Sequence, residues 1–230
     1  MEQSLHTYQQ NAPAWLVTID QNEIPSREWT NPAILHAARS LQPQSILDVG
    51  CGEGWLLRTL AAPDGNYNPP EKRVGIDGVP ALIEAASKRD PAGQYLTIPY
   101  DQLSADADLG SFELIICNYS LFGKESVVEL LQKLTHFISP KGYLLIQTIH
   151  DTVFPDPSRW VEEDWCAMKQ NYQGGYKWYY RSLAEWNRDF EQSGWSMFRY
   201  IETSKPDGGK LSYIFMMVPR ASARAGSEML

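Results

Sequence analysis

The stretch ILDVGCGEGWLL, residues 46–57, constrains the fold of this chain more than any other segment. An apolar run typical of a β-strand leads into three glycines at alternate positions, Gly50, Gly52 and Gly54. Glycines tolerate positive φ and let the backbone approach a ligand closely. The helix expected from Trp55 would offer free N–H groups and a partial positive charge to an anionic group. This order of strand, glycine turn and helix indicates a cradle for a nucleotide or a related cofactor.

The glycine spacing narrows the choice of cofactor. A dinucleotide fingerprint reads G-x-G-x-x-G/A, whereas this turn reads G-x-G-x-G with the acids Asp48 and Glu53 beside it. Acids gain little beside a pyrophosphate because like charges repel. A cationic ligand with one small carboxylate suits them better. An NAD(P)-binding Rossmann oxidoreductase is therefore the less favoured alternative.

The motif at residues 48–54, DVGCGEG, resembles the first motif of the class I S-adenosylmethionine-dependent methyltransferases. The resemblance covers about residues 45–148, and the flanks resemble the ubiquinone-pathway-like, small-molecule subgroup more weakly. It implies S-adenosyl-L-methionine as cofactor, S-adenosyl-L-homocysteine as product, and methyl transfer to a small-molecule acceptor by in-line displacement. A non-catalytic protein that binds S-adenosylmethionine remains a second alternative.

The resemblance also implies roles for residues at the ends of the expected strands. Asp77 would bind the ribose hydroxyls, although it could instead cap the helix that follows. Asp101 would meet the adenine amino group, although it could be a turn residue. Arg27 would meet the cofactor carboxylate, or pair with a neighbouring glutamate on the surface. The implied cofactor-binding residues are Asp48, Gly50, Cys51, Gly52, Gly54, Trp55, Asp77, Gly78, Val79, Tyr100, Asp101, Asn118, Tyr119 and Arg27.

The alternation of strand and helix patterns predicts an α/β fold. Strands are expected at Ser45–Val49, Arg73–Ile76, Gln94–Ile98, Leu114–Asn118, Tyr143–Thr148, Trp195–Thr203 and Leu211–Pro219. The resemblance implies a Rossmann-like seven-stranded sheet, mostly parallel with an antiparallel last strand and helices on both faces. Residues 1–230 would form one domain, with a helical cap (1–41, its second helix from Pro32), a cofactor-binding core (42–149), a lid (150–182) and a C-terminal helix and hairpin (183–220).

The lid is expected to supply substrate contacts because long connections of this kind often cover a site. It is rich in aromatic residues, which would enclose an apolar or planar substrate or form a second small core. Tyr176, Tyr180 and Arg181 are the candidate substrate contacts. His150, which follows the fifth strand, is the candidate general base, with a helix-capping histidine as the alternative.

Composition limits the partners and the compartment. A net charge of −8 and no cluster of lysines and arginines disfavour a nucleic acid partner. Three cysteines, including Cys166, and four histidines lack metal-ligand spacing, so we predict no metal. No apolar run approaches 18 residues and the N-terminus is polar, so we predict no membrane span and a cytoplasmic location. The tail at 221–230 is expected to be loosely ordered. The oligomeric state stays open.

Overall fold

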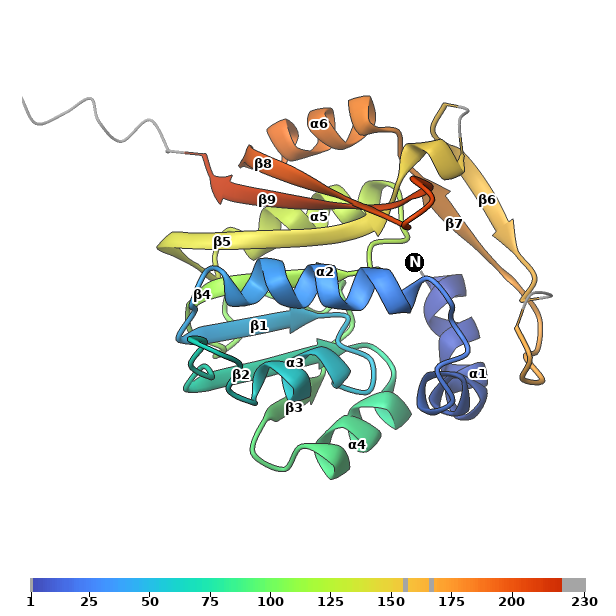
Figure 1. Cartoon of the computed structure of the whole chain (residues 1–230), viewed down its shortest axis with the longest axis horizontal. Coiled ribbons are helices and arrows are strands. Elements are labelled where there is room, and N and C mark those ends of the chain that lie inside the picture. The colour runs from blue at the N-terminus through green and yellow to red at the C-terminus, as the bar shows by residue number, and fades with distance from the viewer. Residues whose placement is uncertain (1, 155–156, 166–167, 221–230) are drawn as a thin grey trace, which may run out of the picture.

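The computed structural model describes residues 2–154, 157–165 and 168–220. The predictions for Cys166 and for the tail at 221–230 therefore lie outside the described residues. A seven-stranded sheet dominates the described part and runs in the order β3-β2-β1-β4-β5-β9-β8 (Figure 1). Its strands are β1 (Ser45–Val49), β2 (Lys72–Asp77), β3 (Gln94–Thr97), β4 (Phe112–Asn118), β5 (Ile138–Ile149), β8 (Trp195–Ser204) and β9 (Lys210–Pro219).

The strand directions confirm the expected topology. Strands β1 to β5 pair in parallel, whereas β9 pairs antiparallel with both β5 and β8. The main difference in strand boundaries lies in β5, which begins at Ile138 rather than at Tyr143. Phe112 pairs with Ile138 and Leu114 with Tyr143, so the register shifts between them. Residues 139–142, which include Pro140 and Gly142, therefore form an irregularity within the strand.

Helices cover both faces of the sheet. They are α1 (Glu2–Asp20), α2 (Arg27–Arg39), α3 (Trp55–Leu60), α4 (Pro80–Arg89), α5 (Glu125–Leu134) and α6 (Leu183–Gln192). Alternate residues of β4 point to opposite faces, as the strand period requires. Ile115 and Cys117 pack in the core beneath α5 and α6, whereas Leu114 and Ile116 pack in the core beneath α2, α3 and α4.

The second cap helix begins earlier than predicted. The N–H groups of Arg27, Glu28 and Trp29 donate to the carbonyls of Ile24, Pro25 and Ser26, which starts α2 more than one turn before residue 32. Pro32 therefore lies inside the helix. A proline there removes one backbone hydrogen bond. The helix continues because Thr30, Ile34 and two alanines bury its inner face.

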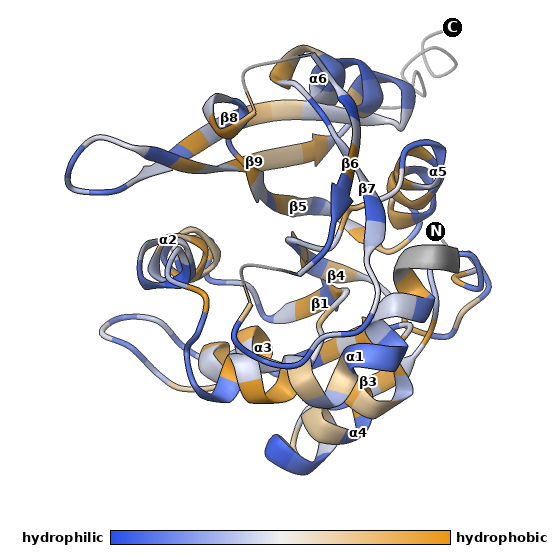
Figure 2. Ribbon diagram, turned by 90° about the vertical axis from the view of Figure 1, so that its right-hand side faces the viewer, coloured by the Kyte–Doolittle hydropathy of each residue, from blue (hydrophilic) through white to orange (hydrophobic). Residues whose placement is uncertain are grey.

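The lid contains a two-stranded antiparallel sheet that the sequence analysis did not predict. Strand β6 (Arg159–Glu163) pairs with β7 (Tyr176–Tyr180), and a short 3-10 turn, η1 (Asp151–Val153), precedes them. The lid and α1 both lie at the edge where β1, β4 and β5 end (Figure 1). Figure 2 shows the connection between β6 and β7 passing beside α1. Among the described residues, no helix combines the length and the apolarity needed to cross a membrane.

Candidate active site

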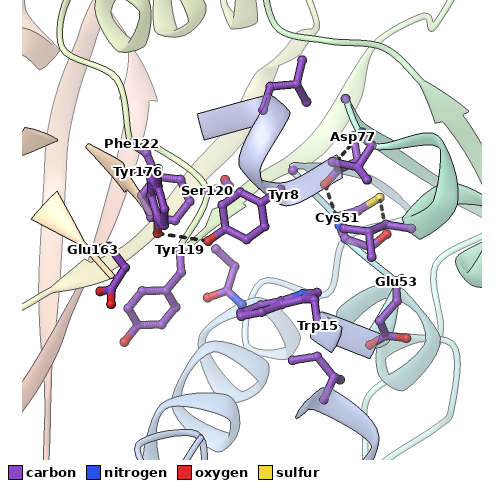
Figure 3. A pocket seen from close by; sticks show the side chains of 18 of the residues that line it. Tyr8, Trp15, Cys51, Glu53, Asp77, Tyr119, Ser120, Phe122, Glu163 and Tyr176 are labelled. Atoms are coloured by element: carbon purple, nitrogen blue, oxygen red, sulfur yellow. Dashed lines mark hydrogen bonds between the residues drawn. The ribbon is translucent and has the colours of Figure 1, made fainter. Parts of the chain in front are cut away.

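A cavity of about 520 Å³ opens at the carboxyl edge of the parallel strands. The glycine turn after β1 and the end of β2 bound one side and the lid bounds the other, while α1 packs against both. Figure 3 shows Cys51, Glu53 and Asp77 on one side of this cavity and Phe122, Tyr176 and Glu163 on the other. The predicted site residues that line the cavity are Arg27, Gly50, Cys51, Gly52, Trp55, Asp77, Gly78, Val79, Tyr100, Asp101, Asn118, Tyr119 and Tyr176.

Two glycines of the turn serve different purposes. Both adopt positive φ, +76° at Gly50 and +55° at Gly52. A Cβ added at Gly50 would lie 2.3 Å from the hydroxyl of Tyr100, so this glycine permits close packing. A Cβ added at Gly52 would meet no atom within 4 Å. The backbone of Gly52 therefore faces open space, as a ligand cradle requires.

Asp77 ends β2 with its carboxylate fixed in place. Its Oδ2 accepts a hydrogen bond from Gly52 N–H at 2.9 Å, and its Oδ1 accepts one from Val79 N–H at 2.9 Å. Burial raises the pKa of Asp77, while these backbone hydrogen bonds oppose the rise. The bond to Val79, at the start of α4, agrees with the capping alternative. Because a carboxylate has about four acceptor sites, the same side chain can still bind two ligand hydroxyls.

Two predicted cofactor contacts do not line the cavity. Asp48 is only 2% exposed, and burial, together with the charges of Asp77 and Glu53, raises its pKa to about 8. It is therefore mainly a neutral acid at pH 7 and lies behind the turn. Gly54 adopts a φ of +77° at the start of α3, and a Cβ there would meet the ring of Tyr95. Its role is in packing.

Glu53 does not provide the free negative charge that the sequence analysis assumed. Its Oε2 accepts hydrogen bonds from Arg58 at 2.9 Å and from Arg89 at 2.8 Å, and its side chain is 1% exposed. Two guanidinium groups therefore compensate this carboxylate. With Asp48 largely protonated, the attraction of a cationic ligand to these two acids is weaker than we expected.

Arg27 is available to a ligand. Its guanidinium lies over the ring of Trp55, 5.4 Å from the centroid, and makes no ion pair with any described residue. Neither of the neighbouring glutamates, Glu23 and Glu28, forms an ion pair with it, and Glu23 instead accepts from Gln170 at 3.1 Å. Burial lowers the pKa of Arg27, yet the group stays charged. A ligand carboxylate would replace the water that the Arg27 guanidinium loses on burial.

The end of β4 reaches the middle of the cavity. Tyr119 adopts a φ of +51°, and its N–H donates to the carbonyl of Gln147 at 2.9 Å. The Oδ1 of Asn118 is buried and accepts no hydrogen bond from the described residues. An unpartnered buried acceptor beside a cavity is costly unless a ligand or water supplies a donor.

Tyr100 and the predicted adenine contact, Asp101, follow β3, and the hydroxyl of Tyr100 packs directly against Gly50. Tyr100 donates from its hydroxyl to the carbonyl of Ser120 at 3.2 Å, which places its ring in the wall. Asp101 is exposed, and its Oδ1 accepts from the N–H of Gln102 at 3.1 Å. This bond agrees with the turn alternative. Asp101 nevertheless borders the cavity and keeps its second oxygen free for a donor.

The predicted general base, His150, is held by other side chains away from the cavity. Its ring does not line the cavity and stacks on Tyr213 at 4.1 Å. Its Nε2 lies 3.0 Å from Glu202 Oε1, and its Nδ1 accepts from Thr152 N–H at 3.1 Å. The capping alternative is therefore correct, because both ring nitrogens hold the start of η1 and the end of β8 together.

Two of the predicted substrate contacts are structural. Arg181 donates to Asp189 Oδ2 at 2.7 Å and to the carbonyls of Gly123 and Lys124 at 2.8 and 2.6 Å, which joins α5, α6 and the lid. Tyr180 is buried, with its hydroxyl 3.5 Å from the carbonyl of Asp151. Neither lines the cavity. Among the described residues, no three potential metal ligands gather anywhere in the fold.

Apart from Tyr176, the residues that form the outer end of the cavity were not predicted from the sequence. Five rings there, which we call the aromatic wall, come from α1, the segment after β4 and the lid. The aromatic wall consists of Tyr8, Trp15, Phe122, Trp165 and Tyr176. Glu163, the last residue of β6, lines the same end. The abundance of aromatic residues in the cap and lid was the available signal, but their partners lie more than 100 residues apart in sequence.

Comparison with known proteins assigns the chain to a family. A sequence profile described as Methyltransferase domain matches residues 26–199. A malonyl-(acyl-carrier protein) O-methyltransferase of Legionella pneumophila is 26% identical over 151 residues, which are 65% of this chain and 49% of that protein. A ubiquinone biosynthesis O-methyltransferase of Azorhizobium caulinodans is 31% identical over 125 residues, 51% of this chain and 46% of that protein. The chain thus spans about half the length of these curated relatives.

Solved structures share the fold at low sequence identity. A DhpI–SAH complex superposes with a TM-score of 0.67 at 15% identity, covering 96% of this chain and 97% of the other. An S-adenosylmethionine-dependent methyltransferase from Mesorhizobium loti has a TM-score of 0.59 at 19% identity, covering 79% of this chain and 95% of the other. At these identities the likeness establishes the architecture.

Proposed function

Because the chain belongs to the methyltransferase-domain family, we propose that it transfers the methyl group of S-adenosyl-L-methionine to a small-molecule acceptor. One observation carries the proposal above the others. The carboxylate of Asp77 is fixed by the N–H groups of Gly52 and Val79 at the rim of a cavity whose other end is the aromatic wall. The cavity therefore offers one polar end for the cofactor and one apolar end for an acceptor.

The residues at the polar end fit the parts of the cofactor. Asp77 would accept hydrogen bonds from the two ribose hydroxyls. Arg27 would bind the carboxylate of the amino acid part, and the uncovered backbone at Gly52 leaves room beside it. Val79 would lie against the adenine, with Asp101 near its amino group. The buried Oδ1 of Asn118 has no partner among the described residues, and a hydrogen-bond donor of the ligand would satisfy it.

The protein has little covalent chemistry to do in such a reaction. S-adenosylmethionine, when bound, supplies a methyl group on a positively charged sulfur that is a good leaving group. The chain must hold the donor and the acceptor in line and keep water out. Good alignment lowers the barrier by roughly 7–11 kcal/mol. The aromatic wall and the lid suit this purpose because they enclose the acceptor end.

The alternatives fit less well. An NAD(P)-binding oxidoreductase needs space for a pyrophosphate at the glycine turn, where the spacing is G-x-G-x-G in place of the dinucleotide pattern G-x-G-x-x-G/A. A non-catalytic binding protein would have no use for a second, apolar half of the cavity.

We also propose that residues 1–230 form one domain. The buried free thiols of Cys51 and Cys117 are compatible with a reducing cytoplasm.

Thermal unfolding with S-adenosylhomocysteine, and separately with NADH, tests the proposed function. At about 100 times its dissociation constant, S-adenosylhomocysteine should add roughly 2.7 kcal/mol to the free energy of unfolding. The midpoint should then rise by about 5–10 °C for a chain of this size. A rise with NADH and none with S-adenosylhomocysteine would contradict the proposal. Release of S-adenosylhomocysteine from S-adenosylmethionine with a pool of acceptors then distinguishes an enzyme from a binding protein.

A further inference from the structure

The charges around the cavity are distributed unevenly. Its charged lining residues are Arg27, Glu53, Asp77, Asp101 and Glu163. Four of them belong to the proposed cofactor end, where Glu53 is already compensated by two arginines. Glu163 alone lies at the end formed by the lid (Figure 3). Among the described residues, the acceptor end thus carries one charged side chain, and that charge is negative.

Glu163 has no cationic partner among the described residues. Its Oε1 accepts a hydrogen bond from the backbone N–H of Trp165 at 3.1 Å, which fixes the carboxylate at the end of β6. Strand pairing places Glu163 opposite Tyr176, and both line the same cavity as Tyr8. The charge of Glu163 adds to the rise in the pKa of Tyr176 after burial, and to the rise in the pKa of Tyr8 after burial, Tyr176 and Asp77. By contrast, the adjacent Glu162 is exposed and pairs with Lys177 at 2.8 Å.

The rings of the aromatic wall line the same cavity and pack against one another. Tyr8 lies 5.7 Å from Trp15, 5.6 Å from Trp165 and 5.4 Å from Tyr176, measured between ring centroids. The hydroxyls of Tyr8 and Tyr176 lie 3.2 Å apart and can accept a hydrogen bond as well as donate one. Ring faces attract cations, and groups of such rings bind ammonium ions.

Resting on the proposed function, we propose that the acceptor is an apolar amine that binds as an ammonium ion against Glu163 and the aromatic wall. An acidic acceptor would meet the repulsion of Glu163. No lysine or histidine lines the cavity in the described ranges, and its one arginine, Arg27, lies over Trp55 at the cofactor end. The rings and the apolar side chains of Ile149 and Met168 then accommodate the body of the amine.

For an amine acceptor, the protons and electron pairs of the methyl transfer can all be accounted for. The ammonium ion first gives one proton to the Glu163 carboxylate, which frees the nitrogen lone pair. That lone pair forms the new bond to the methyl carbon, and the electron pair of the broken carbon–sulfur bond stays on sulfur. The products are a methylated ammonium ion, a neutral thioether and a protonated Glu163, which returns its proton to water.

Binding of an unreactive cation tests the inference without turnover. Benzyltrimethylammonium and its neutral isostere neopentylbenzene would be titrated by calorimetry into the protein saturated with S-adenosylhomocysteine. We expect the cation to bind at least about tenfold more tightly than the isostere. The Glu163→Gln variant keeps an oxygen to accept from Trp165. Its affinity for the cation should fall about tenfold or more, and its affinity for the isostere should not change. The control Glu162→Gln should behave as wild type.

The outcomes separate the inference from the proposed function. Binding of S-adenosylhomocysteine without a preference for the cation would overturn the amine acceptor and leave the methyltransferase proposal intact. The same holds if Glu163→Gln and Glu162→Gln bind the cation equally well. A wild-type protein that does not bind S-adenosylhomocysteine would contradict the proposed function, and the amine acceptor with it.

Discussion

The cofactor end and the acceptor end of the cavity are built in different ways. At the cofactor end, strand ends and the turns after them supply backbone N–H groups and carboxylates, most of them within residues 48–101. At the acceptor end, rings from α1 and the lid pack together although more than 100 residues separate them. A short sequence motif can therefore specify the first end, whereas only the tertiary fold creates the second.

Hydrogen bonds between α1 and the lid show how the acceptor end is held. Asn11 accepts from Gln173 N–H at 2.7 Å and donates to the carbonyl of the same residue at 2.9 Å. The hydroxyl of Tyr172 donates to Thr18 at 2.8 Å. These bonds join the two segments to each other, while the parallel sheet is held by its own ladders. Helix α1 also packs against Val79 and Leu82 at the cofactor end. The lid is therefore the part that should loosen without loss of the cofactor end.

The largest expected effect concerns Asp48 beneath the cofactor end. Its folded pKa of about 8 lies above that of an unfolded aspartate, so the folded state holds a proton that the unfolded state releases. The free energy of unfolding should fall as pH rises from about 4 to about 8, by at most about 1.4 kcal/mol per pH unit. Urea unfolding from pH 5 to pH 8 measures this slope. Asp48→Asn should flatten it, and the exposed control Asp106→Asn should not.

The next largest effect is on ligand affinity, because each end of the cavity should bind its own ligand. Asp77→Asn should raise the dissociation constant of S-adenosylhomocysteine about 100-fold, since two charge-assisted hydrogen bonds of about 1.5 kcal/mol each are lost. Its affinity for benzyltrimethylammonium should not change. Glu163→Gln should show the reverse pattern in the same calorimetric titrations. If both variants weaken both ligands equally, the two ends do not act separately.

A smaller effect concerns the buried charge of Glu53. Glu53→Ala should lower the free energy of unfolding by about 2 kcal/mol, because Arg58 and Arg89 lose a shared, buried partner. Urea denaturation gives the value. The exposed pair of Glu84 and Lys88 provides the control, and Glu84→Ala should cause no resolvable change. Equal effects would show that burial of Glu53 does not strengthen its ion pairs.

The smallest effect concerns the contact between α1 and the lid. Tyr172→Phe removes the hydrogen bond to Thr18 and should cost about 0.5–1.5 kcal/mol. Amide hydrogen exchange should become faster in β6 and β7, while the exchange of β1 and β4 and the affinity for S-adenosylhomocysteine stay as in the wild type. Faster exchange throughout the sheet would contradict the separation of the two ends.

The sequence predicted the sheet and the polar end because both depend on local patterns. Apolar runs followed by glycines or acids placed β1, β2 and Asp77 correctly. The sequence failed where the role of a residue depends on distant partners. His150 binds Glu202, and Arg181 binds the carbonyl of Gly123, and neither partner could be recognised from spacing. Glu163 was missed for the same reason, since only the pairing of β6 with β7 brings it beside Tyr176.

A crystal structure of the protein with S-adenosylhomocysteine would show directly whether the cavity is divided into a cofactor end and an acceptor end. We expect the ribose hydroxyls on the Asp77 carboxylate, the ligand carboxylate on Arg27, and the sulfur facing the aromatic wall with that end of the cavity still free. A ligand bound against Glu163 and the aromatic wall, with Asp77 unoccupied, would contradict the division of the cavity into a cofactor end and an acceptor end.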